Sequence, residues 1–253
     1  MPWNPDKYHQ FQIQRSAPFY DLLDLVAVRR NLRVVDLGCG TGNLTRELAD
    51  LLPDSHVVGM DSSPQMLARA NEYIRDGLRF ERGDQAELMG EWDLIFSNAA
   101  LQWSENHEDL IPYLFDRLAP NGQLLIQVPS NHGGPIHMII RDVAGREPFR
   151  TKLDGWTRKS PVLSLETYAG LLFQCNAIEI TVFEKIYPHV LENSQAVLDW
   201  ISGTALVPYF ERLGSLKGQF VETIKEALDG AMPGSPVFYP FRRTLLSARK
   251  EVI

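Results

Sequence analysis

The sequence predicts an α/β protein built on a mostly parallel, Rossmann-like sheet. Short apolar runs alternate with amphipathic runs from Arg33 to Val128, and strands that alternate with helices in this way form parallel sheets covered on both faces. The first apolar run also leads directly into a glycine-rich turn and a helix pattern, within the segment Val34–Thr45. Sheets of this kind bind ligands at the carboxyl ends of their strands, so we expect the functional site there.

The expected elements follow from the apolar spacing along the chain. Strands are predicted at Arg33–Leu37, His56–Met60, Leu78–Arg82, Trp92–Ser97, Gln123–Val128, Ile178–Tyr187 and Phe241–Lys250. Helices are predicted at Asn43–Leu52, Pro64–Arg75, Glu108–Leu118, Leu165–Cys175, Ser194–Gly203 and Gly218–Leu228. Ser63 before Pro64 is typical of a helix start, and Asn121-Gly122 is expected to separate the third helix from the next strand. Residues 129–163 lack clear periodicity, so we expect an irregular insertion at the functional edge of the sheet.

Length, composition and charge narrow the class of protein. The 253 residues can bury one large core, and 44% hydrophobic with 23% charged residues are ordinary globular values. The net charge of −7 argues against a surface that tracks nucleic-acid phosphates. Cys39 and Cys175 show no metal-ligand spacing, which suits a reducing cytosol. Met1–Gln14 lacks the apolar core of a signal peptide, and no apolar run approaches the roughly 20 residues of a membrane span. We therefore expect a soluble cytoplasmic protein, a monomer or weak dimer, without nucleic-acid or membrane partners.

The glycine-rich turn differs from a dinucleotide-binding turn. A dinucleotide fingerprint needs a third glycine three residues after the second, but Gly38 and Gly40 are followed by Asn43 at that position, and Gly42 comes one residue early. Asp36 stands just before the turn, where its carboxylate would repel a pyrophosphate. A carboxylate there suits a cationic ligand such as S-adenosylmethionine, which carries an ammonium and a sulfonium and no phosphate. A purely structural glycine turn is the alternative interpretation.

Polar residues at the ends of the following strands favour the same ligand. Asp61 ends the second strand, where a carboxylate accepts hydrogen bonds from ribose hydroxyls in nucleotide-binding folds. Asp84 follows the third strand and can accept from an adenine amino group, and Asn98 follows the fourth strand. Each residue alone is more often a loop residue or a helix cap, but their order at successive strand ends indicates one site. That order resembles class I S-adenosylmethionine-dependent methyltransferases from about Arg33 to Val128.

Further stretches resemble the trans-aconitate 2-methyltransferase family. They are Trp3–Tyr8 with Phe11 and Arg15-Ser16, Asp36–Gly40, Asp61–Pro64, Asn98-Ala99, Leu101–Trp103, Pro135 with His137 and Arg141, Asp199-Trp200, and Phe241–Arg243 through Ala248-Arg249. The strand-end motifs are shared by methyltransferases in general, whereas the N-terminal segment and Leu101–Trp103 are more specific. The resemblance extends over most of the chain.

This resemblance implies a fold, a domain organisation and a reaction. The fold is a class I methyltransferase fold, with a mostly parallel seven-stranded sheet, an antiparallel last strand and a helical cap. Residues 1–253 would form one methyltransferase domain, in which 1–30 cover the cofactor, 31–128 bind it, and 129–163 and 188–235 form cap and substrate insertions. Such enzymes use S-adenosyl-L-methionine to esterify a carboxylate of a small polycarboxylic acid. A carboxylate is already ionised at pH 7, so we expect neither a general base nor a metal.

The motifs and the resemblance assign candidate residues to a cofactor site and an acceptor site. The candidates for the cofactor are Tyr8, Arg15, Asp36, Gly38, Cys39, Gly40, Asp61, Ser62, Met66, Asp84, Gln85, Asn98 and Ala99. The candidates for the acceptor are Arg15, Trp103, His137, Arg141, Tyr187 and Arg243. Cations suit the carboxylates that do not react, because arginine binds a carboxylate through two parallel hydrogen bonds. Packing by Tyr8, and solvent-facing positions for Arg141 and Arg243, are the structural alternatives.

Two positions depart from the family pattern and leave the acceptor open. Members of the family often carry an arginine where this chain has Val207, and an acid commonly precedes the proline matching Pro135, where this chain has Gly134. A site with one cation fewer suits a dicarboxylate or a monocarboxylate as well as a tricarboxylate. The competing interpretations are a methyltransferase acting on malonyl-acyl carrier protein, another small-molecule methyltransferase, and a protein that binds S-adenosylmethionine without catalysis.

Overall fold

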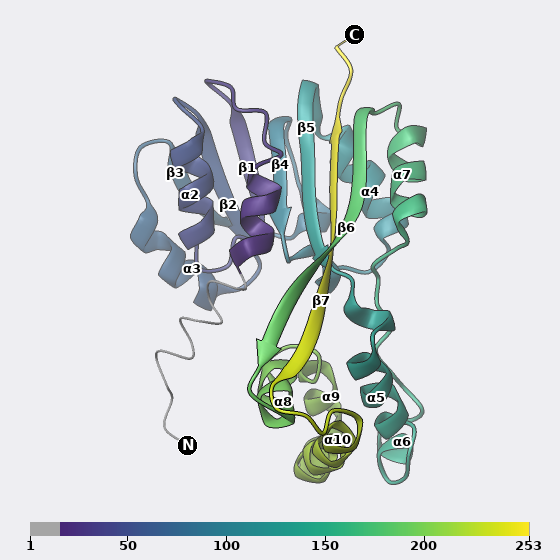
Figure 1. Ribbon diagram of the computed structural model, residues 1–253. Helices are drawn as coiled ribbons and strands as arrows, with labels where there is room; N and C mark the ends of the chain where they lie inside the picture. Colours follow the sequence, from purple (N-terminus) through teal and green to yellow (C-terminus); the bar gives the residue numbers. More distant parts are fainter. Residues whose placement is uncertain (1–15, 253) are drawn as a thin grey trace. The chain divides into compact units, whose positions relative to one another are not determined.

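The computed structural model describes residues 16–252 and contains a seven-stranded sheet of order β3-β2-β1-β4-β5-β7-β6 (Figure 1). The strands are β1 (Arg33–Leu37), β2 (His56–Asp61), β3 (Leu78–Arg82), β4 (Trp92–Asn98), β5 (Leu118–Pro129), β6 (Ile178–Leu191) and β7 (Val237–Arg249). The first five strands pair in parallel, and β7 pairs antiparallel with β5. The strand order reverses between β1 and β4, as in doubly wound sheets. The predicted α/β fold, including the antiparallel last strand, is therefore confirmed.

The chain divides into two compact units, which we describe separately. Unit 1 comprises the described parts of Met1–Pro129 and Arg243–Ile253 together with Pro161–Lys185. Unit 2 comprises Ser130–Ser160 and Ile186–Arg242. Among the described residues, no helix combines the length and the apolar character that crossing a membrane requires.

The predicted helices of unit 1 are present. The helical segments are residues 16–23, α2 (Asn43–Leu51), α3 (Pro64–Ala70), α4 (His107–Asp116) and α7 (Leu165–Gln174), with the 3-10 turns η1 (Asn71–Tyr73), η2 (Gln85–Glu87) and η3 (Leu101–Trp103). Ser63 caps α3 as expected: its Oγ accepts a hydrogen bond from the backbone N–H of Met66 at 3.3 Å, and Pro64 begins the helix. The helix is shorter than predicted because the chain tightens into η1 after Ala70.

Two hydrophobic clusters cover the two faces of the sheet in unit 1. Alternate residues of β5 separate the faces: Leu124 and Ile126 belong to one cluster, and Leu125 belongs to the other. The first cluster includes side chains of α4 and α7, and the second includes side chains of α2 and of residues 16–23. This separation follows from the pleat of a strand, whose successive side chains point to opposite faces. It allows residues 94–98 of β4 and 123–129 of β5, which pair in continuous register with their neighbours, to be assigned to a face.

Unit 2 contains the two helices predicted at Ser194–Gly203 and Gly218–Leu228, as α8 and α10, and further helices that were not predicted. Its helical elements are η4 (Asn131–Gly133), α5 (Pro135–Ala144), α6 (Phe149–Lys152), α8 (Ser194–Ser202), α9 (Val207–Leu213), η5 (Gly214–Leu216) and α10 (Lys217–Ala231). The prediction of an irregular segment over 129–163 was wrong, because α5 buries Ile136, Ile140 and Val143 along one face with helical spacing. The short helix α9 was missed because seven residues show barely two turns of periodicity.

The strand bounds also differ from the prediction. Strands β6 and β7 are longer than expected, β6 at its end and β7 at its start. Asn121 was expected between a helix and a strand, but it lies within β5 and has a left-handed φ of 61°. The pairing shifts at this point, since Trp92 pairs with Leu118 whereas Leu94 pairs with Gln123. Between these two pairs β5 has more residues than β4, and the turn at Asn121 accommodates them as an irregularity of the bulge type.

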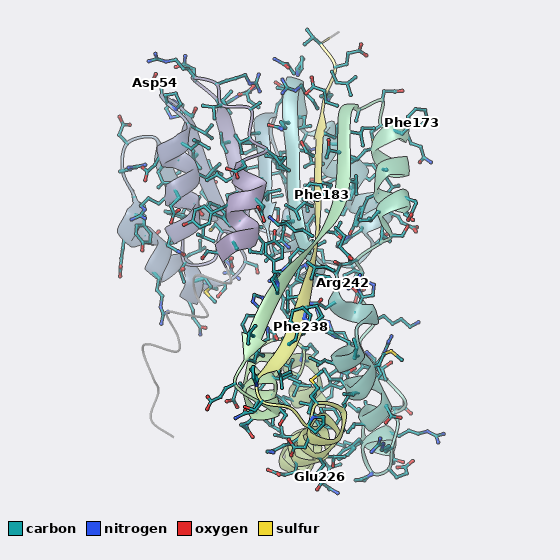
Figure 2. All side chains as sticks on the ribbon, viewed as in Figure 1. Asp54, Phe173, Phe183, Glu226, Phe238 and Arg242 are labelled. Carbon is teal, nitrogen blue, oxygen red and sulfur yellow. The ribbon has the colours of Figure 1, made fainter. Side chains whose placement is uncertain are left out.

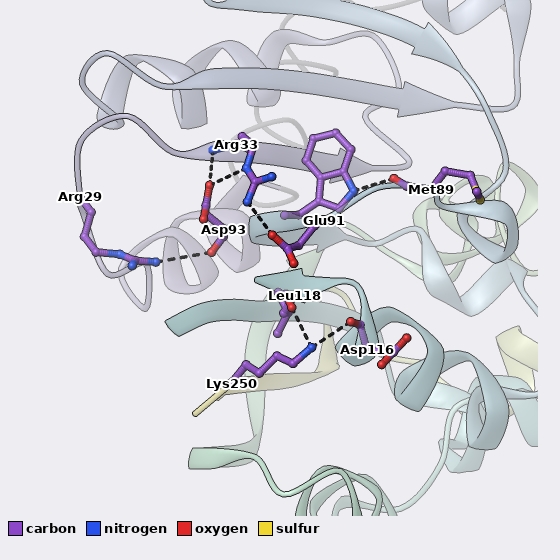
Figure 3. Close-up of polar contacts among 9 residues, drawn as sticks. Arg29, Arg33, Met89, Glu91, Asp93, Asp116, Leu118 and Lys250 are labelled. Carbon is purple, nitrogen blue, oxygen red and sulfur yellow. Dashed lines mark hydrogen bonds and ion pairs between the residues drawn. The ribbon is translucent and has the colours of Figure 1, made fainter. Parts of the chain in front are cut away.

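Charged residues at the amino ends of the parallel strands form a structural network (Figure 3). Arg33 begins β1 and bonds Asp93 near the start of β4, through its backbone N–H at 2.8 Å and its Nε at 3.2 Å. It also forms an ion pair with Glu91 at 3.0 Å. Lys250 donates to the carbonyl oxygen of Asp116 at 3.0 Å, where a cation suits the end of α4. The Arg33 contacts join the start of β1 to residues at the start of β4, and the Lys250 contact joins the end of β7 to the end of α4.

Unit 2 has an aromatic core of its own. The ring of Phe220 on α10 packs edge-on against Phe149 of α6, with centroids 5.0 Å apart. The same ring stacks on Tyr209 of α9 at 5.6 Å. By contrast, Phe238 on β7 is 61% exposed, and it is labelled in Figure 2. The helices of unit 2 therefore bury a core formed from both of its chain segments.

Candidate active site

A cavity of about 370 Å³ opens in unit 1 at the carboxyl ends of β1, β2, β3 and β4. Its lining residues are Leu37, Gly38, Gly40, Met60, Asp61, Ser62, Ser63, Met66, Gly83, Asp84, Gln85, Ala99, Ala100 and Trp103. They include these residues predicted for the cofactor: Gly38, Gly40, Asp61, Ser62, Met66, Asp84, Gln85 and Ala99. The parallel sheet thus brings four separate stretches of sequence to one place.

The three glycines of the turn have different structural roles. Their φ angles are 72° at Gly38, 56° at Gly40 and 76° at Gly42, a region that residues with a side chain rarely adopt. A Cβ at Gly38 would lie 2.1 Å from the Cβ of Ala100, and one at Gly42 would lie 2.8 Å from the ring of Phe80. A Cβ at Gly40 would meet nothing within 4 Å. Gly38 and Gly42 therefore permit close packing, whereas Gly40 leaves a ligand room beside the backbone.

Asp61 holds the turn in position. Its Oδ2 accepts a hydrogen bond from the backbone N–H of Gly40 at 2.9 Å, and its Oδ1 accepts from the N–H of Ser63 at 2.8 Å. Each carboxylate oxygen has a further lone pair. The side chain can therefore accept hydrogen bonds from two neighbouring hydroxyls of a ligand while it joins the end of β2 to the turn after β1.

Asp84, Gln85 and Trp103 form the part of the cavity that follows β3 and β4. The Oδ1 of Asp84 accepts from the backbone N–H of Ala86 at 2.8 Å and caps η2. Gln85 donates a hydrogen bond from Nε2 to the hydroxyl of Ser104 and so links η2 to the residue after η3. Trp103 is 56% exposed and lines the cavity. The structure thus places Trp103, a candidate for binding the acceptor, at the cavity where we expect the cofactor.

Asp36 is buried and is not among the lining residues. Its Oδ2 accepts a hydrogen bond from the hydroxyl of Thr45 at 2.6 Å. Burial raises the pKa of Asp36 to about 7; the hydrogen bond from Thr45 opposes this shift, and the charge of Asp61 adds to it. A cation bound beside the turn would favour the ionised form of this carboxyl group. The electrostatics of the turn therefore suit a cationic ligand.

Cys39 and Asn98 are also not among the lining residues. The side chain of Cys39 points toward Gly59, where an added Cβ would lie 3.1 Å from its own Cβ. Burial raises the pKa of the Cys39 thiol, which makes it unreactive. Asn98 ends β4, and its Oδ1 is buried without a hydrogen-bond partner among the described residues. The remaining cofactor candidates, Tyr8 and Arg15, lie outside the described residues.

The other acceptor candidates are distributed over both units. Arg243 belongs to unit 1, where it is buried on β7 in register with Pro129. His137 and Arg141 belong to unit 2 and lie on α5, the first half-buried and the second exposed. Tyr187 is a buried residue of β6 in unit 2.

Positive groups surround His137 within unit 2. Burial lowers the pKa of His137 to about 4, and the charges of His132, Arg158 and Arg141 contribute to the same shift. The imidazole is therefore neutral at pH 7, with one nitrogen as donor and one as acceptor. Arg158 is a cation that the sequence analysis missed; its backbone N–H donates to the hydroxyl oxygen of Tyr209 at 3.1 Å. No sequence spacing relates Arg158 to α5, so the sequence held no signal for this grouping.

Comparison with known proteins identifies the family. Residues 29–148 match the model of a methyltransferase domain. A trans-aconitate 2-methyltransferase of Deinococcus radiodurans is 44% identical over 257 residues, which cover 99% of this chain and 99% of the relative. Another from Mycobacterium tuberculosis is 39% identical and covers 97% of this chain and 96% of the relative. The chain belongs to the trans-aconitate 2-methyltransferase family. It is a methyltransferase, as the motifs at the strand ends predicted.

Solved structures agree with the fold of this member of the trans-aconitate 2-methyltransferase family. The YcgJ protein from Bacillus subtilis has a TM-score of 0.62 at 14% identity and covers 92% of this chain and 98% of its own. Phosphoethanolamine N-methyltransferase 2 of Haemonchus contortus, solved with S-adenosyl-L-methionine, has a TM-score of 0.56 at 20% identity. That match covers 92% of this chain and 52% of the other. At these identities the likeness shows the fold alone.

Proposed function

We propose that this chain transfers a methyl group from S-adenosyl-L-methionine to a carboxylate of trans-aconitate or a similar small polycarboxylic acid, forming a methyl ester. The observation that carries the proposal is the similarity, over almost the whole chain, to relatives named trans-aconitate 2-methyltransferase. The cavity supports it, because acids line it and a glycine turn leaves room beside the backbone.

The residues of the cavity fit S-adenosyl-L-methionine. Asp61 would hold the two ribose hydroxyls, and Asp84 would accept from the adenine amino group. The buried carboxyl group of Asp36 favours a cation beside the turn. A pyrophosphate would meet the negative charge of Asp61 and would be repelled. These acidic side chains therefore favour a cationic nucleoside over a dinucleotide.

The reaction requires orientation more than acid–base chemistry. When bound, S-adenosyl-L-methionine supplies an electrophilic methyl group, so that a carboxylate oxygen forms the new C–O bond as the S–C bond breaks and a neutral thioether leaves. The acceptor carboxylate is already ionised at pH 7, so the chain need not remove a proton. Its residues must place the oxygen in line with the methyl group and exclude water, and such orientation contributes roughly 7–11 kcal/mol.

Cationic and hydrogen-bonding side chains would hold the acceptor. We assign this role to Arg15, Trp103, His137, Arg141, Tyr187 and Arg243. Arg243 is the buried cation of the described part of unit 1, and a buried guanidinium binds a carboxylate strongly and with defined geometry. Val207 begins α9 and is 36% exposed. Because it adds no charge where the family often has an arginine, we include dicarboxylic acids among the acceptors.

A methyl-transfer screen tests the proposed function. The full-length protein would be incubated with methyl-labelled S-adenosyl-L-methionine and a panel of tri-, di- and monocarboxylic acids that includes trans-aconitate. Mass spectrometry should detect a product one methyl group heavier than the acid, and mild base should return the acid, since an ester hydrolyses and an N-methyl group does not. A base-stable product, or no transfer to any acid despite cofactor binding, would overturn the proposal.

We also propose that the protein acts in the cytoplasm as a monomer or a weak dimer on a soluble small molecule. The two cysteines, which form no disulfide, support a reducing compartment. Light scattering during size-exclusion chromatography at several concentrations tests the assembly. A stable oligomer at low concentration would contradict it.

A further inference from the structure

Four polar residues share one face of the unit 1 sheet near the carboxyl ends of the parallel strands. We call them the polar row: Asp36 on β1, Asn98 on β4, Gln127 on β5 and Arg243 on β7. These strands are consecutive in the sheet, in the order β1-β4-β5-β7. The row therefore runs across four adjacent strands, with an acid at one end, a guanidinium at the other and two amides between them.

Register and packing place these residues on the same face. Leu125, Phe96 and Leu245 belong to one hydrophobic cluster and therefore to one face of the sheet. Gln127 and Asn98 follow Leu125 and Phe96 by two residues, so they share that face. They are also register partners on neighbouring parallel strands, which lie roughly 4.8 Å apart.

Arg243 extends the row on the next strand. Gln127 pairs with Leu245 across β5 and β7. Arg243 precedes Leu245 by two residues and is thus the diagonal neighbour of Gln127, at roughly 7–8 Å, within reach of long side chains. Both residues are buried. Gln127 therefore lies between an amide and a buried cation.

The amide of Gln127 is buried without being satisfied. Neither its Oε1 nor its Nε2 has a hydrogen-bond partner within residues 16–252, although the side chain is fully buried. A buried amide in this state is unfavourable unless a ligand or a water supplies the missing hydrogen bonds.

Gln123 shows how the same strand satisfies a structural glutamine. It lies on the same face of β5, four residues earlier, and is also buried. Its Oε1 accepts from the backbone N–H of Ala27 at 3.0 Å, and its Nε2 donates to the carbonyl oxygen of Leu25 at 2.9 Å and to the hydroxyl of Ser247 at 3.2 Å. The contrast separates a glutamine that holds the fold from one whose amide is available for a ligand.

We infer that Gln127 is an acceptor-binding residue, whose Nε2–H donates to the acceptor carboxylate beside Arg243. No residue of β5 lines the cofactor cavity described above, which is formed by the ends of β1 to β4. Gln127 therefore lies beyond the cofactor, on the side of the cation. The order of the polar row matches the two substrates, since Asp36 favours the cationic donor and Arg243 favours the anionic acceptor. This inference rests on the proposed function, because it assumes a carboxylate acceptor.

The test compares Gln127→Met with the matched control Gln123→Met. Methionine preserves the volume and removes the amide. In Gln127→Met we expect the KM for the acceptor to rise about tenfold or more, as for loss of one charge-assisted hydrogen bond. The Kd for S-adenosyl-L-methionine should stay within about twofold of wild type, and the melting temperature should be unchanged or higher. In Gln123→Met we expect a lower melting temperature and an unchanged KM, because its partners lose their hydrogen bonds.

Each other result overturns a specific part of the inference. If Gln127→Met is active and its KM for the acceptor is unchanged, the amide is hydrogen-bonded to water and does not bind the acceptor. A weakened Kd for the cofactor with an unchanged acceptor KM would place Gln127 at the donor. A melting temperature as low as that of Gln123→Met would show a structural role. If the wild-type protein methylates no carboxylic acid, the proposed function is overturned, and the role of Gln127 with it. If the wild type is active, a negative result in the variant counts against the role of Gln127 alone.

Discussion

Single residues at this site combine a structural role with a proposed ligand-binding role. Asp61 is the example: its two carboxylate oxygens hold the backbone of Gly40 and Ser63 while facing the cavity. A carboxylate that already accepts two backbone hydrogen bonds is fixed in orientation before the ligand arrives. If it binds the cofactor as proposed, it would lose little further side-chain entropy.

Asp61→Asn should weaken S-adenosyl-L-methionine binding by about tenfold or more. The substitution keeps the size but replaces one acceptor oxygen with an NH2 group, and hydrogen bonds to a charged group contribute roughly 1.5–3 kcal/mol. Isothermal titration calorimetry measures the Kd. Glu81→Gln is the control, since Glu81 pairs with Arg79 on the surface and should leave the Kd unchanged. An unaltered Kd in Asp61→Asn would contradict the ribose-binding role.

Gly40→Ala and Gly42→Ala should separate binding from folding. Both positions have a left-handed φ, so alanine costs roughly 1–2 kcal/mol of backbone strain at each. At Gly42 the new Cβ also collides with Phe80, whereas at Gly40 it enters open space beside the cavity. We expect Gly42→Ala to lose more unfolding free energy in urea and Gly40→Ala to lose more cofactor affinity. Equal losses of stability with equal affinities would refute this division.

At the scale of elements, one buried histidine positions the loop that carries Trp103. The Nδ1 of His107 lies 2.5 Å from the hydroxyl of Tyr168, and its Nε2 lies 2.8 Å from the carbonyl oxygen of Leu101. A carbonyl only accepts, so Nε2 carries the proton and Nδ1 accepts from the tyrosine. Burial lowers the pKa of His107, which keeps the ring neutral. The histidine thus joins α4, α7 and η3 and is structural.

Tyr168→Phe should destabilise the fold by about 1 kcal/mol or slightly more. The buried Nδ1 of His107 loses its donor, and the backbone N–H of Leu163 loses its acceptor at 3.3 Å. Urea denaturation measures the free energy of unfolding. Tyr20→Phe is the control, because the hydroxyl of Tyr20 bonds Glu47 on the surface and its loss should cost much less. Equal effects of the two substitutions would argue against a positioning role for His107.

At the scale of the whole molecule, Asp36 and His137 are titrating groups whose shifted pKa values affect stability in opposite directions. Burial raises the pKa of Asp36 in unit 1 to about 7, so the folded protein retains a proton that the unfolded chain releases near pH 4. Burial lowers the pKa of His137 in unit 2 to about 4, so the unfolded chain binds a proton below about pH 6.5 that the folded protein does not. Between about pH 4 and 6.5 the two contributions oppose each other.

Single substitutions should expose each contribution. Asp36 makes the free energy of unfolding fall as the pH rises from about 4 to 7, by up to roughly 1.4 kcal/mol per pH unit, and Asp36→Asn removes that fall. His137 makes the free energy of unfolding rise from about pH 4 to 6.5, and His137→Gln removes that rise. Urea denaturation without cofactor at several pH values in this range measures both slopes. If either variant kept the wild-type slope, the corresponding pKa shift would be refuted.

The sequence by itself determined the fold class, the turn at Gly38–Gly42 and the acids at the strand ends, because these depend on residues adjacent in the chain. Only the tertiary structure decided that Asp61 bonds Gly40, that Asp36 is buried and does not line the cavity, and that unit 2 contains α5. It also distinguished Gln123 from Gln127, which share a strand, a face and a residue type. The physical reason is that hydrogen-bond satisfaction depends on partners distant in sequence, which register and packing supply and apolar periodicity does not encode.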